Sequence, residues 1–205
     1  MRARSGICGG GHTPDRYPEV SIEQAARLPS SAVAGYAMIH HLGITRDDTL
    51  LAHGAAGGVG SAAIQCCMWC ACHWNRVSSQ SRLSSITGWG AHPVDDTVDM
   101  VDVICKFGPI TASADAAGGA ASVAATVALL PAGRRAVTAW GDEYSNAAGI
   151  PWVSHPADEL YQVTTLAVQG LLNIRIAEIL SLSDAAVALE HIKAGHSPGK
   201  ILLRP

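Results

Sequence analysis

Residues 49–65 read TLLAHGAAGGVGSAAIQ, and this stretch decides the fold. The run TLLAH at 49–53 has the length and apolar character of a buried strand. The glycine-rich turn at 54–60 follows it, and residues 61–65 begin an apolar helix. A strand, a glycine-rich turn and a helix in this order are typical of the first unit of a nucleotide-binding α/β sheet.

The turn contains a candidate phosphate site, Ala55-x-Gly57-x-x-Gly60, which is the G-x-G-x-x-G pattern with alanine at its first position. Glycine at 57 lets the backbone approach a pyrophosphate, and glycine at 60 lets the helix pack closely on the strand. The amide groups of Gly58 and Val59, at the helix N-terminus, would bind the anion. The alternative is a turn that serves only as a tight connection. The strand before it and the helix after it favour the phosphate site.

Two helices are predicted before this strand. Ser21 and Gln24 have the spacing of a capping box at the start of a short helix, which Pro29 is expected to end. Residues 31–42 are predicted to form a second apolar helix, closed by Gly43.

Strands and helices continue to alternate after the turn. Strands are predicted at 75–79, 93–94, 109–117, 135–140 and 150–154, and helices at 97–106, 121–130 and 156–172. This alternation predicts an α/β fold with a doubly wound parallel Rossmann sheet over residues 21–172.

The composition excludes several function classes. The chain has 205 residues, of which 48% are hydrophobic and 15% charged, so it is expected to be globular. A formal net charge of −3 predicts no nucleic-acid or membrane partner, and no apolar run is long enough to span a bilayer. Four of the six cysteines crowd into residues 66–72. This clustering argues against a disulfide framework and predicts a cytoplasmic protein.

Longer motifs resemble one family. The segments 21–65, 90–96 (GAHPVDD), 115–119 (DAAGG), 129–138 (LLPAGRRAVT) and 194–205 (AGHSPGKILLRP) are similar, in this order, to zinc-free quinone-oxidoreductase-like members of the medium-chain dehydrogenase/reductase superfamily. The resemblance implies that the chain binds a nicotinamide dinucleotide. It also implies hydride transfer from NADPH to a small molecule, a quinone or activated enone, without catalytic zinc.

The residues that follow the first helix bear on the choice of cofactor. Sites that prefer NAD place a carboxylate about 20 residues after the glycines. Residues 78–82 read SSQSR and contain no carboxylate, so NADP is predicted. Ser79 and Arg82 are candidate ligands of its 2′-phosphate. The alternative is that Arg82 is a solvated surface residue.

Three further residues are candidates. The resemblance implies an aromatic residue near the nicotinamide at Tyr36, as an active-site wall or proton donor, although Ala34 replaces the family's threonine; a tyrosine of the core is the alternative. Asp115 is expected at the carboxyl end of a strand, where doubly wound sheets bind ligands, or else as a helix cap. His53 is expected to be structural.

Residues 66–89 do not resemble the family. Cys66, Cys70 and His73 would share one helical face, which raises the possibility of a zinc site. The helix after the glycine turn normally packs on the sheet, however, where free cysteines behave as small apolar residues. No metal is therefore predicted.

The family's N-terminal GroES-like catalytic barrel has almost no counterpart, and residues 1–20 are expected to be an irregular remnant of it. Residues 173–205, predicted as a strand at 174–180, a helix at 183–194 and a strand at 200–203, resemble the segment that returns to that barrel. Their apolar positions would then lie uncovered, which predicts a self-associating chain or homo-oligomer. These positions are Ile176, Ile179, Val187, Ile192 and Leu202. The alternative to an active oxidoreductase is a truncated cofactor-binding module without turnover of its own.

Overall fold

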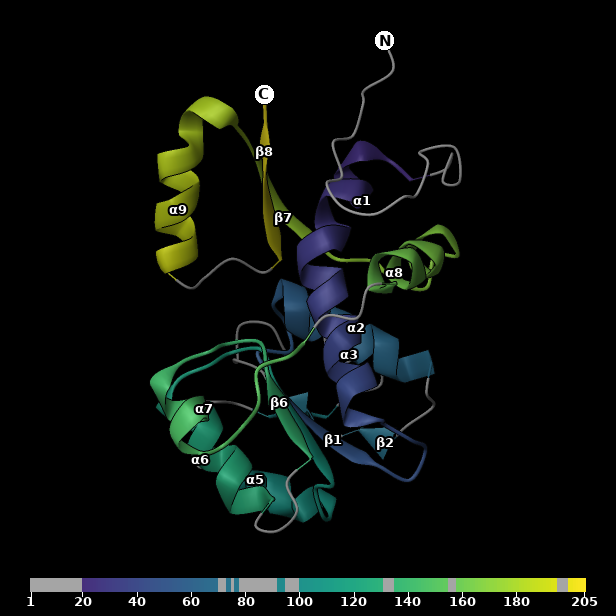
Figure 1. Ribbon diagram of the computed structural model, residues 1–205. Coiled ribbons are helices and arrows are strands. Elements are labelled where there is room, and N and C mark those ends of the chain that lie inside the picture. The colour runs from purple at the N-terminus through teal and green to yellow at the C-terminus, as the bar shows by residue number, and fades with distance from the viewer. Residues whose placement is uncertain are drawn as a thin grey trace.

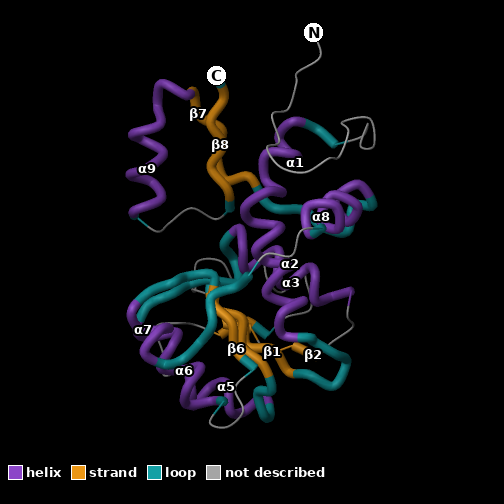
Figure 2. The backbone as a smooth tube through the Cα atoms, in the orientation of Figure 1, coloured by secondary structure: helices purple, strands orange, loops and turns teal. Residues whose placement is uncertain are grey.

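Parallel strands, with helices on both sides of them, form the larger part of the protein (Figures 1 and 2). The computed structural model describes residues 20–69, 73–74, 76–77, 92–94, 100–130, 135–154, 158–194 and 199–205. Within these ranges, strand β2 pairs with β1, β1 with β5, and β5 with β6, all in parallel. The predicted doubly wound α/β fold is confirmed.

The strands of this larger part are β1 (Thr49–His53), β2 (His73–Trp74), β3 (Arg76–Val77), β4 (Pro93–Val94), β5 (Ala112–Asp115) and β6 (Ala136–Thr138). Strand β3 follows β2 after one residue and pairs in parallel with β4. The larger sheet has the strand order β2-β1-β5-β6, and β3 and β4 form a separate two-stranded pair. The order reverses between β1 and β5, which makes this the point where an open α/β sheet binds its ligand.

Helices cover both faces of the sheet because the side chains of a strand alternate between its faces. Leu50 and Ala52 of β1 pack with α2 (Val33–Leu42), α3 (Gly58–Trp69) and α8 (Glu159–Val168). Leu51, between them, packs in a second core cluster. That cluster includes residues of α5 (Met100–Ile104) and α6 (Ala120–Leu129). Figure 1 shows α5, α6 and α7 (Glu143–Ala147) gathered on one side of the sheet.

The helix before the sheet begins as expected. The Ser21 hydroxyl accepts a hydrogen bond from the Gln24 amide at 3.1 Å, and the Gln24 side chain accepts one from the Ser21 amide at 3.1 Å. This capping box opens α1 (Ile22–Arg27). At the other end, Gly43 closes α2 in the left-handed region, with φ of 54°.

The prediction that Pro29 ends the first helix is wrong. A π-helical segment, η2 (Leu28–Ala32), joins α1 directly to α2. Proline lacks an N–H group and is tolerated at the start of a helical segment, where that group has no intrahelical partner. The Val33 amide donates to the Leu28 carbonyl, five residues back. The chain therefore remains helical past the ring of Pro29.

Several boundaries also differ from the predictions. The strand predicted at 150–154 contracts to one parallel bridge between Trp152 and Thr138, because β6 itself ends at Thr138. Helix α7 was not predicted. It begins where the Asp142 side chain accepts a hydrogen bond from the Ser145 amide at 2.8 Å. The strand predicted at 75–79 lies partly outside the described residues. Within the described part, β3 covers 76–77.

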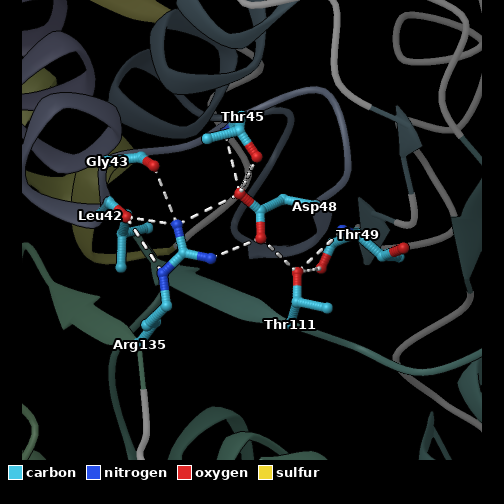
Figure 3. Close-up of polar contacts among 7 residues, drawn as sticks. All are labelled: Leu42, Gly43, Thr45, Asp48, Thr49, Thr111 and Arg135. Carbon is cyan, nitrogen blue, oxygen red and sulfur yellow. Dashed lines mark hydrogen bonds and ion pairs between the residues drawn. The ribbon is translucent and has the colours of Figure 1, made fainter.

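An ion pair ties together the amino-terminal ends of three neighbouring strands (Figure 3). Asp48, just before β1, pairs with Arg135, just before β6. Its carboxylate also accepts from the hydroxyl of Thr111, before β5, at 2.8 Å, and from the amide of Thr45 at 2.8 Å. Arg135 in turn donates to the Leu42 carbonyl at the end of α2, at 2.6 Å. These contacts lie at the edge of the sheet opposite the ends that bind ligands in such folds.

The C-terminal elements form a smaller unit. Strands β7 (Ile176–Ser181) and β8 (Lys200–Arg204) pair in parallel, and the 3-10 segment η5 (Leu182–Asp184) and helix α9 (Ala185–Lys193) lie between them in the chain. Figure 1 shows this unit beside the helices that cover the larger sheet. Only Ala188 of α9 is buried. The exposed apolar side chains of the unit are Ile179, Leu182, Val187, Leu189, Ile192 and Leu203.

Candidate cofactor-binding site

The turn between β1 and α3 is folded tightly around the carbonyl of Gly54. The Gly57 amide donates to that carbonyl at 2.9 Å. A Cβ atom at Gly60 would lie 2.2 Å from the same oxygen, so only glycine fits there. Gly54 has a φ of +67°, and a Cβ on it would meet the backbone of Ala116 at 2.9 Å. Sequence reasoning did not include Gly54 among the site residues. Its place directly after the strand, at the start of the glycine-rich turn, was the available signal.

The first turn of α3 offers backbone N–H groups to a ligand. Helix geometry leaves the first amides, those of Gly58, Val59 and Gly60, without carbonyl partners within the helix. Gly58 and Val59 are partly exposed, while Ala55 and Gly60 are buried. The first turn carries no acidic side chain. This end of α3 therefore has the donors and the dipole polarity that an anion requires.

Gly57 and Gly58 differ in their surroundings. A Cβ at Gly57 would meet only the Gly54 carbonyl oxygen, at 3.2 Å, so the rest of the space beside residue 57 is open. A Cβ at Gly58 would lie 2.6 Å from the Ser31 hydroxyl oxygen of η2. Gly58 thus also lets η2 pack against the start of α3, a packing role that the sequence pattern does not reveal.

Asp115, at the end of β5, lies directly beside His53 in the register of the sheet. One oxygen of its carboxylate accepts from the amides of Ala117 and Gly118, both at 2.9 Å. The other oxygen accepts from the Ser122 hydroxyl at 3.0 Å. These contacts hold the loop between β5 and α6, which covers Gly54. They do not cap α6, whose N-cap residue, Gly119, has no side-chain cap hydrogen bond.

His53 is enclosed in the core beneath the turn. Its Nε2 lies 3.1 Å from the Thr126 hydroxyl oxygen, which lies 3.0 Å from that of Ser113. Burial lowers the pKa of His53, while the charge of Asp115 partly opposes this shift. The imidazole is therefore neutral at physiological pH and serves to join β1 to α6, in agreement with a structural role.

The loops after β5 and β6 are bound to each other. The Gly119 amide donates to the Asp142 carboxylate at 2.8 Å, and the indole N–H of Trp140 donates to the Ala116 carbonyl at 3.1 Å. Gly118 has a φ of +73°, and a Cβ on it would meet the Trp140 ring at 2.9 Å. Sequence reasoning missed Trp140, although a tryptophan directly after a short strand was a visible signal.

Tyr36 lies on α2 beside the start of α3. The preceding residue, Gly35, packs on α3 so closely that a Cβ on it would lie 2.7 Å from the Val59 carbonyl oxygen. The Tyr36 ring is partly buried and stacks with His40 one turn later, with ring centroids 6.2 Å apart. The Tyr36 side chain packs at the margin of the first core cluster.

Ser79 and Arg82, the predicted ligands of the 2′-phosphate, lie outside the described residues. So does Cys70 of the possible zinc site. Cys66 and Cys67 are buried on α3. Among the described residues, no three His, Cys, Asp or Glu side chains are grouped so that they could hold a metal ion. In the same part of the chain, no helix is long and apolar enough to cross a membrane.

Comparison with known proteins identifies the sequence family. The sequence model of the family described as zinc-binding dehydrogenase matches residues 85–203, more than half of the chain. A search of curated proteins gave no match.

Solved structures share the fold. The quinone oxidoreductase of Coxiella burnetii is 23% identical, with a TM-score of 0.79 over 91% of this chain and 62% of that chain. A thermostable alcohol dehydrogenase of Pyrobaculum aerophilum, with bound cobalt and zinc, is 23% identical, with a TM-score of 0.75 over 91% of this chain and 58% of that one. The human synaptic vesicle membrane protein VAT-1 homolog-like protein is 18% identical, with a TM-score of 0.73 over 92% of this chain and 63% of that one. The chain thus spans about three-fifths of the length of these structures.

Proposed function

Since the chain belongs to the zinc-binding dehydrogenase family, as the sequence resemblance indicated, we propose that it binds NADPH at the carboxyl edge of its sheet. There it takes part in hydride transfer from the cofactor to a quinone or activated enone. The observation that carries the proposal is the turn around the Gly54 carbonyl. It combines glycines that tolerate no side chain with partly exposed amides at the N-terminus of α3.

The pyrophosphate is placed at the amides of Gly58 and Val59, beside the open space at Gly57. A dinucleotide bound at the reversal of strand order extends to both sides of it. The adenosine half then lies toward β2 and β3, where Ser79 and Arg82 follow in the sequence and are proposed to bind the 2′-phosphate. The nicotinamide half lies toward β5 and β6, with Asp115 holding the loop beneath it.

When bound, the nicotinamide supplies the hydride, and the residues of the chain bind and orient the cofactor. Tyr36 is proposed as a wall of the site or a proton donor to the reduced substrate, because the sequence resemblance implies an aromatic residue near the nicotinamide at this position. Zinc has no part in this proposal, although the family's description includes it.

A second candidate function is a cofactor-binding module that has no turnover alone. The observation in its favour is the set of exposed apolar side chains on β7, α9 and β8, which nothing in the described part of the chain covers. NADPH binding without quinone or enone reduction by the isolated chain would favour this module, and brisk turnover would favour the oxidoreductase. The crowding of four cysteines into residues 66–72, which argues against a disulfide framework, supports a reducing compartment, and we propose that the chain is cytoplasmic.

The test is Gly57→Val, measured by titration calorimetry with NADPH and NADH. The valine side chain would occupy the space proposed for the pyrophosphate while its Cβ meets only one protein atom, the Gly54 carbonyl oxygen at 3.2 Å. We expect the wild type to prefer NADPH and the variant to lose both cofactors, with a loss of at least about tenfold in affinity, which corresponds to roughly 1.4 kcal/mol.

The matched control is Gly170→Ala. Gly170 follows α8 with a φ of +72°, and a Cβ atom on it would meet no other atom within 4 Å, so this change strains the backbone away from the site. It should lower stability and leave cofactor affinity unchanged. Full affinity in Gly57→Val would show that the turn is only a connector, and equal affinity of the wild type for NADH would refute the preference for NADPH.

A further inference from the structure

Trp140 lies at the carboxyl edge of the sheet, two residues after the end of β6. Its side chain lies against Gly118, where a Cβ atom would come within 2.9 Å of Cγ and 3.1 Å of Cδ1. The residue is nevertheless 54% exposed. The indole is therefore backed by glycine backbone on one side and open over much of the rest of its surface.

The ring is also held in place. Its N–H donates to the Ala116 carbonyl at 3.1 Å, and its backbone amide donates to the Thr138 hydroxyl at 3.0 Å. The contact between Gly119 and Asp142, at 2.8 Å, binds together the two loops that carry these groups. Because the polar N–H is already satisfied, what remains available for a ligand is the π face.

Ala116 connects this ring to the glycine turn. Its carbonyl accepts the Trp140 hydrogen bond, and the same group lies 2.9 Å from the position of a Cβ on Gly54. Trp140 is therefore linked through Ala116 to Gly54, the first residue of the glycine turn, and lies on the β5 and β6 side of the strand reversal. The proposed ligands of the 2′-phosphate, Ser79 and Arg82, follow the strands on the other side.

We propose that Trp140 is a stacking platform for a planar, electron-poor ring, an inference that rests on the proposed function. Indole has the most electron-rich face among protein side chains, and it attracts cations and electron-poor rings placed over that face. Two rings of this chemistry belong to the proposed reaction. One is the oxidised nicotinamide ring, which carries a positive charge, and the other is the ring of a quinone acceptor.

The experiment compares Trp140→Leu and Trp140→Phe with the wild-type chain by titration calorimetry. The probes are NADP⁺ and 2′-phospho-ADP-ribose, which lacks the nicotinamide ring. If the nicotinamide stacks on Trp140, the leucine variant binds NADP⁺ about five- to tenfold more weakly and binds 2′-phospho-ADP-ribose equally well. The phenylalanine variant keeps most of the NADP⁺ affinity because it keeps an aromatic face.

A second arm measures binding of a 1,4-naphthoquinone, with and without saturating NADP⁺. If the quinone is the ring that stacks, Trp140→Leu weakens quinone binding and leaves NADP⁺ binding unchanged. Trp152→Leu is the matched control. Trp152 is 64% exposed, and its indole N–H also binds a backbone carbonyl, that of Ala139, at 3.3 Å. Because the carbonyl that it binds is that of Ala139 and not that of Ala116, which faces the glycine turn, its loss should change neither affinity.

The proposal is overturned if Trp140→Leu changes neither affinity. It is also overturned if the variant loses 2′-phospho-ADP-ribose as strongly as NADP⁺, since the ring would then act only through the fold, which thermal unfolding of each variant would show. A wild-type chain that binds neither nucleotide refutes the proposed function instead. The quinone arm without nucleotide then still decides whether Trp140 binds a ring.

Discussion

At the scale of single residues, the Asp48 carboxylate, just before β1, has a strongly lowered pKa. Hydrogen bonds from Arg135, Thr45 and Thr111 hold its pKa well below the ordinary value. A carboxyl group with a lowered pKa in the folded state stabilises that state above its unfolded pKa, and this contribution is lost as the pH falls. We expect Asp48→Asn to lower the free energy of unfolding by about 2 kcal/mol at pH 7. The difference from wild type should shrink below about pH 4. Urea unfolding of the wild type and of Asp48→Asn at several pH values measures this difference. The control is Asp47→Asn, which changes an exposed neighbouring carboxylate in the same way. A difference that does not depend on pH would show that the charge of Asp48 is unimportant.

At the scale of elements, the continuous helix of α1, η2 and α2 places Ser31 and Gly35 against α3, and so supports the glycine turn from behind. Its first turn depends on the capping box at Ser21. Ser21→Ala removes the hydroxyl that accepts the hydrogen bond of the Gln24 amide. It should lower the free energy of unfolding by about 1 kcal/mol. Ser21→Asp should restore it, because aspartate is an equally good N-cap. Thermal unfolding of the two variants decides this. If both are as stable as wild type, the start of α1 is supported by packing alone.

At the scale of the whole molecule, the unit of β7, α9 and β8 exposes several apolar side chains together, and we expect the purified chain to self-associate. Val187 and Ile192 of α9 are 47% and 57% exposed. The double variant Val187→Lys with Ile192→Lys should therefore shift the chain toward the monomer in light scattering and sedimentation. Tyr144→Lys, which changes an exposed aromatic residue on α7, should not. A wild-type chain that remains monomeric at high concentration would contradict the expectation.

The sequence alone determined the fold class and the place of the candidate site. Apolar runs, glycine turns and helix caps are patterns of residues that are neighbours in the sequence. They therefore predicted β1, the start of α3 and the cap at Ser21. Strand boundaries were predicted less well. Residues 150–154 have the composition of a strand, but only Trp152 pairs, with Thr138 of β6. A strand extends only as far as its neighbour does, and that length is a tertiary property.

Only the tertiary structure decided which side chains meet at the site. Gly54 and Ala116 are distant in sequence, and their contact exists because β1 and β5 end at the same edge of one parallel sheet. The same geometry brings Trp140 over Gly118 and encloses His53 with Thr126. A single residue such as Trp140 can be noticed in the sequence, but its contact partner cannot, because each residue fits its own element equally well before the strands pair. The pattern of residues 49–65 thus determined where a dinucleotide is expected to bind, and the pairing of the strands decided what surrounds it.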